Sequence, residues 1–115
     1  MRVLVCGGRD YSNKDRVFDV LDKLHDEAGI SCVIQGGAKG ADYFAAWWAD
    51  KRRVPGETYA ADWENQGSFA GPARNTRMLE EGRPDVVIAF PGGRGTSDMV
   101  RKARRAGVDV VEIAP

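Results

Sequence analysis

The chain has 115 residues, which is enough for one domain with a single hydrophobic core and too short for two. Apolar residues make up 43% and charged residues 30%, the composition of an ordinary soluble globular protein. Its formal net charge is zero, so no overall field attracts nucleic acid or an anionic membrane. The apolar stretch 1–6 is far too short for a signal peptide or a membrane span. We therefore expect one cytoplasmic domain over residues 1–115, with no membrane partner.

Both cysteines, Cys6 and Cys32, lie in apolar runs that resemble strands. This placement favours buried free thiols in a reducing compartment over a disulfide or a metal site. We expect neither a metal ion nor a cofactor.

In chain order, short apolar runs alternate with segments of helical periodicity. The first run ends at Gly7-Gly8, and a helix follows Ser12 or Asn13 and closes at Gly29. The predicted strands are residues 2–6, 31–35, 57–60, 85–90 and 108–113, and the later predicted helices are about 41–51, 72–82 and 96–106.

One segment, 61–71, shows no periodicity and carries Trp63 and Phe69, which are candidates for stacking on a ligand. It predicts a long loop, and long ordered loops in small domains are often functional. Pro72 suits the first position of the helix that follows.

Five strands alternating with four helices predict an α/β fold, a parallel sheet with helices on both faces. The strand order 3-2-1-4-5 would make it a Rossmann-like three-layer sandwich. Three of the four strand-to-helix turns contain Gly-Gly, at 7–8, 36–37 and 92–93. In a parallel sheet these turns share one edge, where the chain switches direction and ligands bind.

The stretch 89–98 carries the clearest of these turns: a buried strand breaks at Pro91-Gly92-Gly93, and a helix resumes at Thr96 or Ser97. A helix begins with unpaired N–H groups and the positive end of its dipole, which together favour a bound anion. Taken alone, a plain turn explains the stretch equally well. Neither 7–12 nor 36–40 matches a dinucleotide or P-loop signature, so a generic NAD enzyme or P-loop NTPase is not expected.

The motif Pro91-Gly92-Gly93-Arg94-Gly95-Thr96 resembles the Pro-Gly-Gly-x-Gly-Thr signature of the LOG (Lonely Guy) phosphoribohydrolases and of the wider Smf/DprA–LOG (SLOG) superfamily. Residues 74–78 are similar to the Arg-Lys-x-x-Met element of LOG enzymes, with Asn75 in place of the lysine. Residues 36–42, the Trp63 loop and 71–75 resemble the YspA-related branch more closely. The resemblance implies a Rossmann-like fold and a nucleotide or nucleotide-derived ligand. In LOG members it implies hydrolysis of the N-glycosidic bond of nucleoside 5'-monophosphates.

One position departs from the LOG pattern, because the catalytic glutamate of that signature corresponds to Met99. A thioether neither stabilises an oxocarbenium-like transition state nor activates water. Asp98 is one residue earlier, about 100° around the helix, and remains a substitute carboxylate in its first turn.

If the domain is an enzyme, Arg74 and Asp98 are the catalytic candidates. A cation such as Arg74 in a first helical turn opposes the helix dipole, which favours contact with a ligand over a structural role. For Arg94 and Lys39 a solvated side chain is an equal alternative, and Asp42 suits a helix N-terminus by its charge alone. The predicted ligand-binding residues are Gly7, Gly8, Arg9, Gly36, Gly37, Lys39, Gly40, Asp42, Asn75, Pro91, Gly92, Gly93, Arg94, Gly95, Thr96 and Ser97.

Two functions fit these residues. The first is a module that binds a nucleotide, ADP-ribose or a related small molecule without turning it over. The second is a nucleotide N-glycosidase acting through Asp98, Asp10 or another carboxylate. A nucleic-acid-handling role, as in the DprA branch, is a weaker third, because the expected basic face with interleaved aromatics is missing. The aromatic residues Phe44, Trp47 and Trp48 on one helix, together with the LOG resemblance, predict a homodimer or a higher oligomer.

Overall fold

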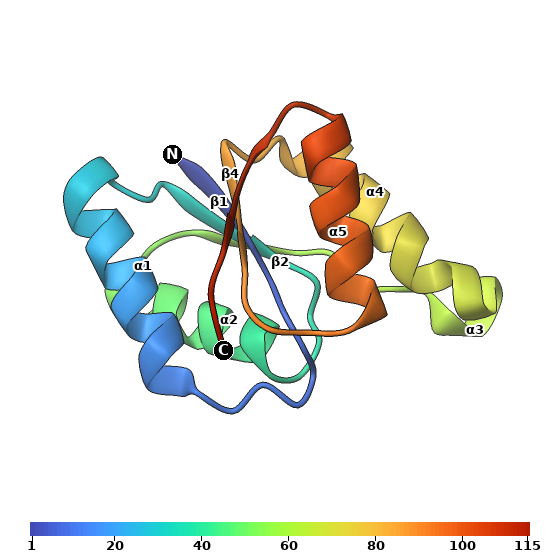
Figure 1. The fold of residues 1–115 in the computed structure, drawn as a ribbon, viewed down its shortest axis with the longest axis horizontal. Helices are drawn as coiled ribbons and strands as arrows, with labels where there is room; N and C mark the ends of the chain where they lie inside the picture. Colours follow the sequence, from blue (N-terminus) through green and yellow to red (C-terminus); the bar gives the residue numbers. More distant parts are fainter.

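Five parallel strands form one sheet, in the order β3-β2-β1-β4-β5, in the computed structural model, which describes residues 1–115 (Figure 1). This confirms the predicted α/β Rossmann-like architecture and its strand order. Val3 of the central strand is in register with Val33 on one side and Val86 on the other. The strands are β1 (Arg2–Cys6), β2 (Cys32–Gln35), β3 (Gly56–Thr58), β4 (Val86–Ala89) and β5 (Asp109–Glu112).

Two pairs of helices cover the sheet, one pair on each face (Figure 1). One face carries α1 (Lys14–Ala28) and α2 (Ala41–Arg52), and the other carries α4 (Ala70–Gly82) and α5 (Arg94–Arg105). Because successive residues of a strand point to opposite faces, β1 contributes to both hydrophobic layers. Val3 and Val5 face α1 and α2, whereas Leu4 faces α4 and α5.

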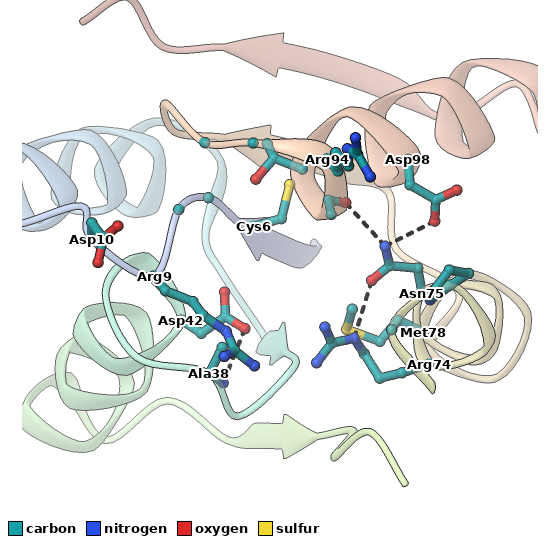
Figure 2. A pocket seen from close by; sticks show the side chains of 18 of the residues that line it. Cys6, Arg9, Asp10, Ala38, Asp42, Arg74, Asn75, Met78, Arg94 and Asp98 are labelled. Carbon is teal, nitrogen blue, oxygen red and sulfur yellow. Dashed lines mark hydrogen bonds between the residues drawn. The ribbon is translucent and has the colours of Figure 1, made fainter. Parts of the chain in front are cut away.

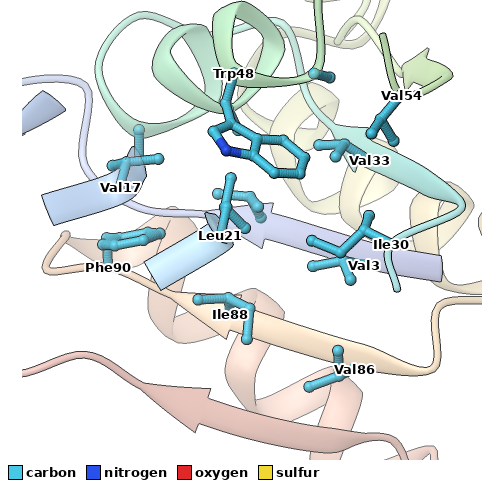
Figure 3. Packing of buried hydrophobic residues seen from close by; sticks show 14 residues of the cluster. Val3, Val17, Leu21, Ile30, Val33, Trp48, Val54, Val86, Ile88 and Phe90 are labelled. Atoms are coloured by element: carbon cyan, nitrogen blue, oxygen red, sulfur yellow. The ribbon is translucent and has the colours of Figure 1, made fainter. Parts of the chain in front are cut away.

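Figure 3 shows the hydrophobic layer beneath α1 and α2. It contains 14 buried residues, compared with 10 in the layer beneath α4 and α5. Trp48 is completely buried in the larger layer and donates an indole N–H to Asp22 Oδ1 at 2.8 Å. Of the three aromatic residues that the oligomer prediction named, Trp48 is therefore buried, Phe44 is partly buried and Trp47 is 37% exposed. Tyr43, which that prediction did not name, is 60% exposed.

Capping residues fix the ends of α1 as expected. Asn13 accepts a hydrogen bond from the Arg16 N–H at 3.0 Å, and Gly29 takes a positive φ of 73° where the helix ends. Polar N-caps and C-terminal glycines with positive φ are common signals, which is why the sequence located this helix well.

The prediction of a long loop over 61–71 is wrong. A short helix, α3 (Trp63–Gln66), is followed by a 3-10 turn, η1 (Gly67–Phe69), and α4 already begins at Ala70. Asp62 caps α3 by accepting a hydrogen bond from the Asn65 N–H at 3.3 Å. Pro72 is therefore the third residue of α4 and not the first. The fold tolerates it there because the first four N–H groups of a helix have no partner within the helix.

The last helix also begins earlier than expected. The prediction placed its start at Thr96 or Ser97, whereas α5 starts at Arg94 with Gly93 as its N-cap. Arg94 and Gly95 thus belong to the first helical turn and not to the glycine turn.

Both cysteines are free and buried, as predicted, and both pack beneath α4 and α5. None of the helices has the length and the apolar character needed to cross a bilayer.

Candidate functional site

A cavity of about 900 Å³ opens at the carboxyl edge of the sheet (Figure 2). The loop after β1, the loop after β2, the segment from α3 to α4, and the first turn of α5 form its walls. The predicted residues that line it are Gly7, Gly8, Arg9, Asp42, Arg74, Asn75, Gly92, Gly93, Arg94, Gly95, Thr96 and Asp98.

Close packing of the backbone accounts for some of the glycines around the cavity. Gly40 has a φ of 73°, and its Cα lies so close to the Gly8 carbonyl oxygen that a Cβ would collide with it. The Gly8 N–H in turn donates to the Pro91 carbonyl at 2.9 Å. The glycine pair after β1 is therefore held between the start of α2 and the turn that precedes α5.

Gly93 and Gly95 have no comparable reason to be glycine. Neither has a positive φ, and a Cβ at either position would meet no other part of the chain within 4 Å. Both line the cavity at the N-terminus of α5, where Gly93 supplies no capping side chain. The first hydrogen bond of α5 runs from the Ser97 N–H to Gly93 O at 3.0 Å, so the preceding N–H groups have no partner within the helix. The absence of side chains leaves this helix end open to the cavity.

Three arginines line the cavity, namely Arg9, Arg74 and Arg94, and none of them makes an ion pair within the chain. Burial lowers the pKa of Arg74, although the nearby Asp42 carboxylate acts in the opposite direction. A half-buried guanidinium that contacts no carboxylate directly is costly, and a bound anion would offset that cost.

Arg74 is also fixed by neutral partners. Its Nη1 donates to the Gly36 carbonyl at 2.7 Å and its Nε donates to Asn75 Oδ1 at 3.1 Å. A Cβ on Gly36 would collide with Arg74 Nη1, so the second glycine turn makes room for this side chain. Asn75, which is buried, donates from Nδ2 to the Gly95 carbonyl at 3.1 Å and thereby connects Arg74 to α5 (Figure 2).

Asp42 is the buried carboxyl of the cavity, with 6% of its surface exposed. Its Oδ2 accepts hydrogen bonds from the N–H groups of Gly36 at 3.0 Å and of Ala38 at 3.3 Å. Burial raises the pKa of Asp42 to about 6, although these two hydrogen bonds and Arg74 each act to lower it. Sequence placed this residue at a helix N-terminus, but the two backbone donors come from the loop after β2.

Asp98 is in the opposite situation, since both of its oxygens are already paired. Oδ1 accepts from Arg101 Nη2 at 2.7 Å, while Oδ2 accepts from Asn75 Nδ2 at 3.0 Å and lies 3.0 Å from Lys102 Nζ. Burial alone would raise the pKa of Asp98, but the bonds from Asn75 and Lys102 outweigh it and leave the pKa below its usual range. Such a carboxylate is poorly suited to exchange protons. Met99 is fully buried in the core and does not line the cavity.

Trp63 of α3 lies at the cavity and is 49% exposed. The Arg9 guanidinium carbon lies 5.7 Å from the centre of its ring, a cation–π geometry that links the loop after β1 to α3. Phe69, the other aromatic residue of this segment, is 77% exposed and does not line the cavity.

Six predicted ligand-binding residues lie outside the cavity lining, and two of these have an evident structural role. Gly36 accommodates Arg74, and Gly40 accommodates the loop after β1, as described above. Some residues that line the cavity were not among the predicted ligand-binding residues, namely Cys6, Ala38, Ser68, Gly71, Pro72 and Met78. The residues outside the lining are Gly36, Gly37, Lys39, Gly40, Pro91 and Ser97.

Fold and site together define the class of the protein: a Rossmann-like α/β domain with a glycine-rich cleft at the carboxyl edge of its sheet. The chain belongs to the YspA, cpYpsA-related SLOG family, whose sequence model matches residues 1–66. It is 42% identical over 118 residues to the Gene 61 protein of Mycobacterium phage D29, covering 96% of this chain and 94% of that protein.

Two solved structures share the fold. The protein TM1055 superposes with a TM-score of 0.76 at 19% identity, over 95% of this chain and 71% of that one. DNA processing protein A (DprA) from Streptococcus pneumoniae gives a TM-score of 0.55 at 21% identity, over 96% of this chain and 58% of that one. The matched residues 1–66 include the first two glycine turns, whereas the motif at 91–96 lies outside them.

Proposed function

We propose that this chain is a cytoplasmic protein that binds a nucleotide or a nucleotide-derived ligand in the cleft. The observation that carries the proposal is that three arginines without ion pairs, Arg9, Arg74 and Arg94, line the same cleft as the uncapped N-terminus of α5. Membership of the SLOG family and the fold shared with TM1055 and DprA support a nucleotide-related role.

In this arrangement the anionic group of the ligand lies against the first turn of α5, between Gly92 and Thr96. The N–H groups and the helix dipole attract it there. Arg74 or Arg94 then closes over the anion, and each charge-assisted hydrogen bond contributes about 1.5–3 kcal/mol.

Calorimetric titration with nucleoside monophosphates and ADP-ribose tests this function. Arg74→Ala should weaken binding by roughly tenfold to a hundredfold. Arg77→Ala is the matched control, because Arg77 lies one turn further along α4, pairs with Glu81 and does not line the cleft. If no nucleotide binds, or if both variants bind as the wild type does, the proposal is wrong.

Hydrolysis of the N-glycosidic bond should be slow or absent even where binding is clear. The position of the LOG glutamate is the buried Met99, and Asp98 is held in ion pairs. Release of free base at an ordinary enzymatic rate, abolished in Asp98→Asn, would make the protein a hydrolase instead.

A further inference from the structure

Asp42 has one oxygen that the protein does not use. Oδ2 takes both backbone hydrogen bonds, whereas Oδ1 has no partner in the chain. Every side-chain nitrogen or oxygen that is sealed from solvent has a hydrogen-bond partner. Oδ1 must therefore be reached from the cavity, although the residue as a whole is 94% buried when its 6% exposure is subtracted. A buried carboxyl with one oxygen aimed at a cleft is an acceptor reserved for a bound molecule.

The surroundings restrict what that molecule presents to Oδ1. The positive charges of Arg9 and Arg74 already act on Asp42, and these two guanidinium groups would repel a further cation approaching the same carboxylate. A phosphate would be repelled by the carboxylate itself. A neutral hydroxyl or N–H group remains.

The position of the proton favours a hydroxyl. Because two N–H donors occupy Oδ2, a proton on this carboxyl has to reside on Oδ1. Burial raises the pKa to about 6, so the protonated and the ionised forms both occur near neutral pH. A hydroxyl accepts from the first form and donates to the second, whereas an amino N–H matches only the ionised form.

Asp42 in α2 and the proposed anion position at the first turn of α5 lie on either side of the glycine pair Gly7-Gly8. Gly40, next to the start of α2, packs on the Gly8 carbonyl, and the Gly8 N–H donates to Pro91 just before α5. Asp42 and the first turn of α5 also line the same cavity, so one ligand in it can place an anion at α5 and a hydroxyl at α2. In a nucleoside 5'-phosphate, the group adjacent to the phosphate is the ribose.

We propose that Oδ1 of Asp42 forms a hydrogen bond with a ribose hydroxyl of the ligand, so that the cleft selects ribonucleotides over deoxyribonucleotides. This inference rests on the proposed function, since it requires a nucleotide in the cleft.

Titration of AMP, 2'-deoxy-AMP and 3'-deoxy-AMP at pH 8 tests the inference. Wild-type protein should prefer AMP to at least one deoxy analogue by about tenfold to a hundredfold, the value of a hydrogen bond to a charged group. Asp42→Asn keeps an oxygen for Gly36 and Ala38 but offers a neutral amide to the cleft. Its preference should fall below about fivefold. Asp50→Asn is the matched control, because Asp50 is an exposed carboxylate on the same helix that does not line the cavity, and it should keep the wild-type preference.

The outcomes separate the two proposals. Equal binding of all three nucleotides by wild-type protein, a result that needs no variant, overturns the role of Asp42 and leaves nucleotide binding intact. A ribose preference that persists in Asp42→Asn assigns the hydroxyl to another residue and also overturns it. Failure of every nucleotide to bind overturns both.

Discussion

Replacing Asp42 by asparagine should stabilise the folded protein more at pH 8 than at pH 4.5. Asparagine is nearly isosteric with the protonated carboxyl and keeps an oxygen for the Gly36 and Ala38 N–H groups. The substitution therefore removes a charge and its titration while it leaves the packing in place.

The magnitude follows from the difference in pKa between the folded and the unfolded chain. Burial raises the folded value from 3.8 to about 6, a difference of about two units, which corresponds to about 3 kcal/mol at full ionisation. The folded chain binds the Asp42 proton more tightly than the unfolded chain does. Protonation of Asp42 therefore stabilises the folded wild type fully below pH 3.8, and this stabilisation is lost as the pH rises through 6. Between pH 4.5 and 8, about 2 kcal/mol of the stabilisation is lost.

Urea denaturation of the wild type and of Asp42→Asn, at several pH values across this range, measures the difference directly. The groups that face Asp42 do not disturb it: guanidinium groups such as those of Arg9 and Arg74 keep their charge, and burial raises the pKa of Cys6 to about 12. Asp98, whose pKa is lowered, contributes with the opposite sign but equally in both proteins. If the difference in unfolding free energy between the two proteins stays constant within about 0.5 kcal/mol from pH 4.5 to 8, burial does not raise the pKa of Asp42 and the reasoning is wrong.

Three further predictions concern the cleft and the assembly. Gly95→Ala should leave the free energy of unfolding unchanged or raise it by up to about 1 kcal/mol, because alanine is the better helix former and its Cβ meets no atom within 4 Å. The same variant should weaken AMP binding at least about tenfold. Ser97→Ala, on the same helix but outside the cleft, should leave AMP binding unchanged in the same titration. Gly36→Ala should weaken AMP binding as much as Arg74→Ala does, because the added Cβ displaces the Arg74 guanidinium. Wild-type affinity in Gly36→Ala would contradict the close contact between Gly36 and Arg74. The aromatic surface that α2 exposes, together with the LOG resemblance, predicts a homodimer or higher oligomer, and light scattering that gives a monomer mass at high micromolar concentration would contradict this prediction.

The sheet and its order could be predicted from the sequence because each central strand is a short apolar run that ends in glycines. Such runs are typical of strands buried on both faces of a parallel sheet. The topology then places all three Gly-Gly turns on one edge without any knowledge of tertiary contacts. The prediction of a long loop over 61–71 was wrong because a single helical turn is too short to show periodicity. Asp62, three residues before Asn65, was the available signal for a capped turn.

Many residues that line the site could be predicted from the sequence, but most of the hydrogen bonds and ion pairs that they make could not. The spacing of Arg101 and Lys102 from Asp98, at i+3 and i+4, already indicates ion pairs on one helix face, and this signal was overlooked. The bonds of Asp42 to Gly36 and Ala38 join a helix to a neighbouring loop, and no periodicity encodes them. Which carboxyl is free to meet a ligand therefore becomes clear only from the folded chain.

The contact between Arg9 and Trp63 gives the protein an internal optical probe. Of its three tryptophans, Trp48 is sealed in the core and bonded to Asp22, and Trp47 does not line the cleft. Only Trp63 combines solvent exposure with a position at the cleft, and its indole faces a guanidinium that a bound anion would attract. We therefore expect a ligand bound in the cleft to change the fluorescence emission of Trp63, so that binding can be followed without any attached dye.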